Sequence, residues 1–275
     1  MSMILRSDVV TSSDGTEIAF ERSGAGPVII LVASALADRS DTKRLARHLA
    51  ERFTVVSYDR RGRGESGDTV PYAPAREVDD LEAVVTAVGG PVTLFGSSSG
   101  AVLALDAAQS LGRTIERLVL FEPPFIVDSS RPPVTPADWD EIRRLVASGR
   151  RSEAVKTFMV RHLGMPRAMI AFMRLLPSWS KLAAMAPTLE YDGEIMSGLQ
   201  SGTSLPRDRW ASMDTPTLVV TGGKSEPFFR SGAEALVELL PAAHHEVLAG
   251  ANHAAVVAAP KRLAAVIDKF TTAFG

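Results

Sequence analysis

The sequence predicts an α/β protein with a largely parallel sheet, because short apolar runs alternate with amphipathic segments along most of its 275 residues. The runs at 27–34 and 91–96 are continuously apolar, as expected for strands buried on both faces. Leu45, Leu49 and Phe53 recur at helical spacing and indicate a helix that covers the sheet. With 45% hydrophobic residues, the chain can build a large core.

The expected elements follow in a simple order. Asp14-Gly15 is a turn signal between two short strand-like runs, so the chain is predicted to begin with a β-hairpin. A strand from residue 115 should end at Pro123-Pro124, since proline cannot continue a buried ladder. The other expected elements are strands at 27–34, 53–59, 91–96, 216–223 and 244–250, and helices at 41–53, 75–88, from Ser99, at 231–240 and from about 260.

The alternation stops after Pro124 and resumes at 216. Residues 128–212 contain several helical segments, many prolines and no convincing strand. This pattern predicts a helical cap inserted between two strands of one sheet. The expected organisation is a core domain of residues 1–127 and 213–275 with a cap of residues 128–212.

Charge and composition exclude several classes of protein. Lys and Arg number 30 against 32 Asp and Glu, a net charge of −2, which argues against a nucleic-acid-binding surface. The absence of cysteine excludes disulfides, thiolate metal sites and a cysteine nucleophile. No secretory signal precedes the first strand, and no apolar run reaches the roughly 20 residues that span a bilayer. A soluble cytoplasmic protein without a bound metal is expected.

The pentapeptide "GSSSG" at 96–100 lies between a buried strand and an Ala/Leu-rich helix. It fits G-x-S-x-G, in which the middle serine occupies a strained strand-to-helix turn. Gly96 and Gly100 would keep that turn free of side-chain clashes. Ser98 would present its hydroxyl above the sheet, and the Ser99 amide would point toward a developing oxyanion. We therefore interpret Ser98 as a nucleophile.

A serine nucleophile needs a base, and placement selects one of the five histidines. His48 belongs to the first crossover helix and His162 to the cap. His244 and His245 are neighbours in a strand and must point to opposite faces. His253 follows the last strand, at the same edge of the sheet as Ser98, and is the predicted base.

The acid that orients the histidine is expected near the same edge. Glu226 follows the strand at 216–223 and precedes a proline, and it is the first choice. Glu122, at the end of the preceding strand, is a second candidate, and Asp128 is a third. The residues alone leave this choice open.

Together, the "GSSSG" turn, the loop "YDRRGRGESG", the carboxylate before Pro227 and "GANH" before the last helix resemble the α/β-hydrolase superfamily, in particular its capped, esterase-like branch. The resemblance implies a mostly parallel eight-stranded sheet flanked by helices, with Ser98 as nucleophile, Glu226 as acid and His253 as base. Where many members carry His-Gly after the third strand, this chain has Val32-Ala33. The resemblance implies that the amide of the next residue, Ser34, completes the oxyanion hole with Ser99.

The expected activity is cofactor-independent hydrolysis of an ester, lactone or thioester of a small apolar molecule through an acyl-enzyme. C–C bond hydrolysis or perhydrolysis with the same triad is an alternative, as is a non-catalytic binder or cyclase on the same fold. The oligomeric state, monomer or homodimer, is left open. The residues expected to line the substrate pocket are Phe125, Phe172, Met173 and Trp179.

Overall fold

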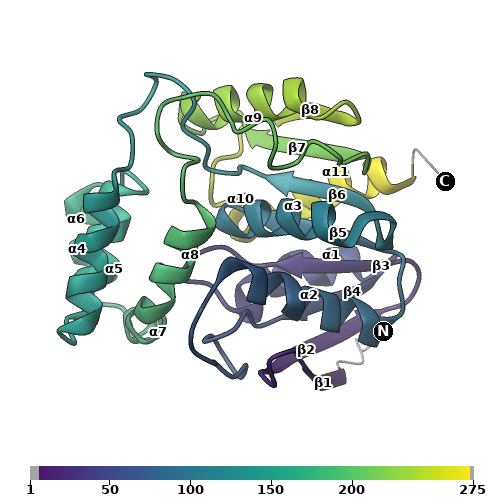
Figure 1. Cartoon of the computed structure of the whole chain (residues 1–275), viewed down its shortest axis with the longest axis horizontal. Coiled ribbons are helices and arrows are strands. Elements are labelled where there is room, and N and C mark those ends of the chain that lie inside the picture. Colours follow the sequence, from purple (N-terminus) through teal and green to yellow (C-terminus); the bar gives the residue numbers. More distant parts are fainter. Residues whose placement is uncertain (1–5, 273–275) are drawn as a thin grey trace.

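The computed structural model describes residues 6–272, which form an eight-stranded sheet between two layers of helices (Figure 1). The strand order is β1-β2-β4-β3-β5-β6-β7-β8. The first two strands form the predicted hairpin and pair antiparallel, β2 also pairs antiparallel with β4, and all the remaining neighbours pair parallel. The strands are β1 (Arg6–Thr11), β2 (Glu17–Gly24), β3 (Val28–Val32), β4 (Thr54–Tyr58), β5 (Val92–Ser97), β6 (Ile115–Phe121), β7 (Thr217–Gly222) and β8 (Ala243–Leu248).

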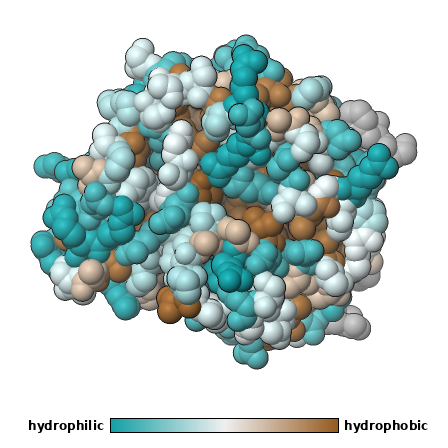
Figure 2. Space-filling view, in the orientation of Figure 1, coloured by the Kyte–Doolittle hydropathy of each residue, from teal (hydrophilic) through white to brown (hydrophobic). Residues whose placement is uncertain are grey.

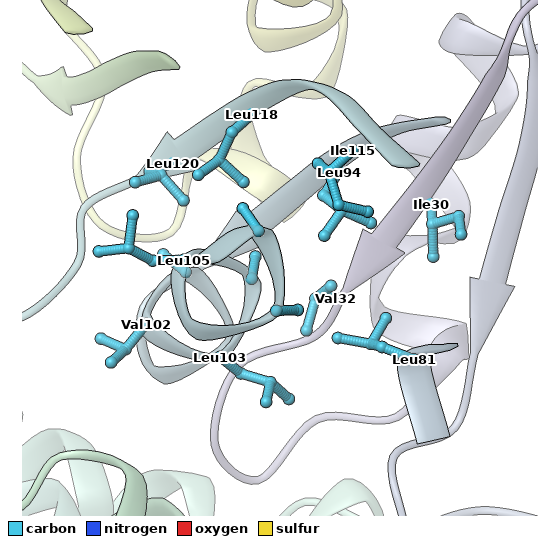
Figure 3. Packing of buried hydrophobic residues seen from close by; sticks show 14 of the residues in the cluster. Ile30, Val32, Leu81, Leu94, Val102, Leu103, Leu105, Ile115, Leu118 and Leu120 are labelled. Atoms are coloured by element: carbon cyan, nitrogen blue, oxygen red, sulfur yellow. The ribbon is translucent and has the colours of Figure 1, made fainter. Parts of the chain in front are cut away.

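Helices cover both faces of the sheet, which explains why the central strands are continuously apolar. Every residue of β5 and of β7 is buried. On one face pack α2 (Pro74–Val88), α3 (Ser99–Leu111) and α9 (Pro227–Leu239). Figure 3 shows Leu105 of α3 near Leu120 of β6, in the cluster that also contains Leu118. On the other face pack α1 (Lys43–Leu49) and α11 (Pro260–Thr272), next to α10 (Ala255–Ala258).

One boundary differs from the expectation in a way that matters for the site. The helix expected at 231–240 begins instead at Pro227, because proline is favoured in the first helical turn, where its missing N–H costs nothing. Glu226 is thereby the N-cap residue of α9. It therefore belongs to the helix start rather than to an open loop beyond the strand.

Five further helices lie between β6 and β7 in the sequence, and Figure 1 shows them beyond one end of the sheet. We call them the cap helices. Among the described residues, no strand lies between β6 and β7. A separate apolar cluster, which includes Ile142, Val155 and Leu189, holds the cap helices together. They are α4 (Pro136–Ala147), α5 (Arg151–Arg161), α6 (Arg167–Met173), α7 (Ser178–Ala184) and α8 (Leu189–Ile195). Short 3-10 turns occur at Arg39–Thr42, Gly112–Thr114 and Ala186–Thr188.

His162, at the end of α5, is buried between the rings of Trp139 and Phe158, whose centroids lie 4.1 and 5.1 Å from its own. Neither ring nitrogen has a hydrogen-bond partner among the described residues. Burial lowers the pKa of His162 to about 4, so the folded protein keeps this imidazole neutral at pH values where the unfolded chain protonates it.

This burial predicts an acid-sensitive cap. As the pH falls below about 6.5, His162 binds a proton in the unfolded state but not in the folded state. The free energy of unfolding therefore decreases until the pH reaches about 4. Between pH 7 and pH 5 the wild type should lose about 2 kcal/mol more unfolding free energy than His162→Phe. Urea unfolding at the two pH values measures this, and equal losses in both proteins would contradict it.

Hydrophilic residues separate small hydrophobic areas on the face shown in Figure 2. Within residues 6–272, no helix is both long and apolar enough to cross a bilayer. The same residues contain no group of three or more His, Asp or Glu side chains arranged to hold a metal ion.

Candidate active site

Ser98 forms the turn between β5 and α3, and its backbone lies at φ 54° and ψ −125°. This region is strained for a residue with a side chain and costs about 1–3 kcal/mol. The flanking glycines make the turn possible. A Cβ on Gly96 would lie 2.3 Å from the carbonyl oxygen of Gly100, and one on Gly100 would lie 2.5 Å from that of Ala33. The prediction that Gly96 and Gly100 keep this turn free of side-chain clashes is therefore confirmed.

His253 follows β8, and its Nδ1 lies 2.7 Å from Oε2 of Glu122. Glu122 follows β6 and is completely buried, and its Oε1 accepts a hydrogen bond of 2.6 Å from the amide of Gly222. With the Nδ1 proton donated to this carboxylate, the imidazole presents Nε2 as its basic nitrogen. The ring of Phe229 stacks on His253 at 4.6 Å, which further fixes its orientation.

In this geometry the second candidate, Glu122, contacts His253 and the first choice of acid does not. Glu226 makes no hydrogen bond to His253; its carboxylate is about half exposed and lies 3.4 Å from the Arg131 guanidinium. The cause is the early start of α9, which places Glu226 at the helix N-terminus beside Gly164. Asp128, the third candidate, accepts hydrogen bonds from the amide and hydroxyl of Ser130 in an exposed turn and does not contact His253.

Backbone strain is concentrated around these residues. Among the described non-glycine residues, only Leu36, Ser98 and Glu122 have positive φ angles, of 54°, 54° and 49°. Leu36 lies in the loop that follows β3, and the other two directly follow β5 and β6. Strained conformations of this kind persist where the surrounding structure enforces them, and they often mark functional sites.

A cavity of about 220 Å³ separates the sheet from the cap helices, and both Ser98 and His253 line it. Its wall is mainly apolar. Among the described residues that line it, Asp41 is the only acidic one and none is a lysine or arginine. The apolar side chains longer than alanine come from the loop after β3, from the cap and from α10 and are Leu36, Phe158, Met159, Leu163, Leu182, Val256 and Val257.

Two backbone amides near Ser98 are available as donors. Ser99 is the first residue of α3, where the helix has no internal acceptor for the amide, and Ser34 lies in the loop after β3 and lines the cavity. Neither amide has an acceptor within residues 6–272. The substitution of Val32-Ala33 for His-Gly therefore leaves a donor at position 34.

The four residues expected to line the pocket do not line this cavity. Phe125 is buried in the main core against Trp210, because the chain turns inward after Pro124. Phe172 is exposed on the outer face of α6, and Met173 is only partly buried against the apolar cluster of the cap helices. Trp179 is buried in the cap, where its Nε1–H donates to Ser152. Composition identified the cap as apolar but could not tell its inner from its outer faces.

The arginines of the loop "DRRGRGES" were also missed as part of the site. From their sequence they are an interrupted basic patch, yet Arg60, Arg61 and Arg63 are among the most buried side chains of the molecule. Arg60 and Arg63 both pair with Asp192 of α8. This partner lies some 130 residues away, so no local signal could have revealed it.

Comparison with known proteins agrees with this architecture. The alpha/beta hydrolase family matches residues 25–266. The chain is similar to an alpha/beta hydrolase from Sphaerobacter thermophilus DSM 20745, with 46% identity and a TM-score of 0.89 over 96% of this chain and 100% of that one. A thermophilic esterase from Thermogutta terrifontis shares the fold at 22% identity and a TM-score of 0.69, over 97% and 98% of the two chains.

Among curated proteins, the uncharacterized hydrolase YraK of Bacillus subtilis (strain 168) is 34% identical over 113 residues. That match covers 40% of this chain and 42% of the relative, so the chain spans less than half of its length. The family match, in contrast, extends over most of the sheet and all of the cap helices. The chain belongs to the alpha/beta hydrolase family.

Proposed function

We propose that the protein is a serine hydrolase that cleaves esters of short, uncharged acyl groups, with Ser98 as nucleophile, His253 as base and Glu122 as acid. The observation that carries the proposal is the 2.7 Å hydrogen bond between His253 and the buried Glu122, beside a cavity that Ser98 also lines. A buried carboxylate in this position fixes the tautomer of the imidazole and stabilises the imidazolium that forms.

In the acylation step, Nε2 of His253 takes the Ser98 proton while Oγ attacks the acyl carbon. The amides of Ser34 and Ser99 hold the resulting oxyanion, and each such donor is worth about 2.7–4 kcal/mol in a comparable enzyme. The imidazolium then returns its proton to the departing alcohol. In the second half, a water molecule activated by His253 attacks the acyl-enzyme, and the carboxylic acid leaves.

The cavity supports the substrate class. At about 220 Å³ it is smaller than the roughly 300–1,000 Å³ of pockets that bind drug-sized molecules. Without a lysine or arginine in its described wall, it offers no partner for an acyl group that carries a second carboxylate. A short alkyl chain, in contrast, would contact Leu163 and Leu182 from the cap.

The proposal predicts a chain-length profile. Wild-type protein should hydrolyse p-nitrophenyl esters of two to four acyl carbons best. With eight carbons, kcat/KM should fall at least about tenfold, because a rise of roughly 1.4 kcal/mol in the activation free energy, caused by a chain too long for the cavity, lowers the rate by that factor. The Ser98→Ala variant gives the background rate.

A profile that rises to eight carbons would contradict the size of the pocket. Absence of turnover with every ester, in a folded protein, would favour the non-catalytic binder or cyclase. Turnover confined to C–C or peracid substrates would favour the two alternative reactions of the same triad.

A further inference from the structure

The proposed oxyanion hole has a second layer, and its central residue comes from the cap helices. Asp192 of α8 is only 1% exposed. Its Oδ1 accepts hydrogen bonds from the Ser99 hydroxyl at 2.7 Å and from Nη1 of Arg60 at 2.9 Å. Its Oδ2 accepts one from Nη2 of Arg63 at 2.8 Å. One carboxylate thus joins the start of α3 to the loop after β4.

The two arginines extend this connection to the loop that carries the other amide. Nη1 of Arg60 donates to the carbonyl oxygen of Ala33 at 3.3 Å, and Nη1 of Arg63 donates to that of Ser34 at 2.7 Å. The carbonyl of Ala33 and the N–H of Ser34 belong to one trans peptide unit and point in opposite directions. By holding the carbonyl, Arg60 turns the Ser34 N–H away from itself.

Charge balance makes Asp192 the critical member of the cluster. Arg60 has a second carboxylate, because Glu77 binds its Nε and Nη2 at 2.6 and 2.8 Å. For Arg63, Asp192 is the only carboxylate partner within residues 6–272. Burial opposes the ionisation of Asp192, but Arg63, Arg60 and the Ser99 hydroxyl together hold its pKa below the ordinary value. The Asp192 carboxylate is therefore a fixed anion between Ser99 and the arginines that hold the loop after β3.

We propose that Asp192 is a positioning residue that aligns both oxyanion-hole amides with Ser98, so that the catalytic geometry depends on the seating of α8. This inference rests on the proposed function. It predicts that loss of the Asp192 charge disturbs the stabilisation of the tetrahedral intermediate more than the binding of the substrate.

The same loop offers a matched control. Arg61 is as buried as its neighbours and pairs with Asp80 through two bonds of 2.7 and 2.8 Å, also reaching Asp14. Within residues 6–272, neither Arg61 nor Asp80 forms a hydrogen bond to the loop after β3, to Ser99 or to Asp192. Asp80→Asn therefore removes a buried charge pair of similar geometry without touching the oxyanion hole.

The experiment measures kcat and KM for the best p-nitrophenyl ester, inhibition by a trifluoromethyl ketone of the same acyl chain, and the midpoint of thermal unfolding. Asp192→Asn should lower kcat about 10- to 100-fold, as expected for displaced donors, and should weaken ketone binding in parallel. KM should change less than about threefold, because ground-state binding does not use the amides. Asp80→Asn should lower the unfolding midpoint comparably while keeping kcat within about threefold of the wild type.

Ser99→Ala provides a second variant that keeps all the ion pairs and removes only the hydroxyl bonded to Asp192. Its kcat and ketone affinity should each fall about 3- to 10-fold, a part of the loss of one donor. If Asp192→Asn does not fold, this variant decides the question, and wild-type kcat and ketone affinity in Ser99→Ala would overturn the proposal. Equal kcat in Asp192→Asn and Asp80→Asn, or a change confined to KM, would also overturn it. A folded wild type without turnover would instead reject the proposed function, and the positioning role with it.

Discussion

Replacement of Ser98 by alanine is expected to lower kcat for a p-nitrophenyl ester by about 10⁶-fold, down to the rate that binding and the oxyanion amides alone can sustain. The physical reason is that the acyl-enzyme can no longer form, so water must attack the ester directly. Alanine and serine are equally strained at the positive φ of this turn, and the substitution removes only the hydroxyl. Stability should therefore remain close to that of the wild type.

Ser97 supplies the matched control for this measurement. It is the preceding residue, it is buried, and it lines the same cavity, but it ends β5 with regular strand pairing. Ser97→Ala should keep most of the activity. Retention of activity in Ser98→Ala, together with its loss in Ser97→Ala, would identify Ser97 as the nucleophile and refute the triad of Ser98, His253 and Glu122.

The second large effect is expected at Glu122. In Glu122→Gln the amide can still accept from Gly222, but its NH₂ group then faces Nδ1 of His253. The imidazole must move its proton to Nε2 to accept this bond, and Nε2 can no longer take the proton of Ser98. A comparable change in a serine protease lowers kcat about 10⁴-fold, and we expect a loss of that order.

Glu226→Gln tests the competing acid under the same conditions. Its carboxylate is about half exposed and pairs with Arg131 at 3.4 Å, so its loss should change kcat/KM less than about threefold. The ratio of the two variants is the informative quantity. A large loss in Glu226→Gln with little loss in Glu122→Gln would show that the loop after β7 rearranges to supply the acid.

The sequence predicted the fold because its signals are local. Continuous apolar runs marked the strands that are buried on both faces, and the glycines around Ser98 marked a turn that only small residues permit. The position of His253 followed from topology alone, since parallel strands bring their carboxyl ends to one edge of the sheet. These inferences needed no knowledge of which side chains touch.

The choice of acid was harder because β6 and β7 are neighbours and each is followed by a glutamate. The two glutamates differ in their backbone conformation. Glu122 has a positive φ angle of 49°, whereas Glu226 is the N-cap residue of α9, which begins at Pro227. A proline follows both glutamates in the sequence, so the local pattern carried no distinction. The pairing of Asp192 with the loop arginines was equally hidden, because long-range ion pairs leave no trace in spacing.

A fluorophosphonate probe tests most directly whether Ser98 is an activated nucleophile. Folded wild-type protein should form one adduct per chain, and peptide mass mapping should place it on Ser98, with much slower labelling in Glu122→Gln. An adduct on another residue, or no adduct in the folded wild type, would contradict the account.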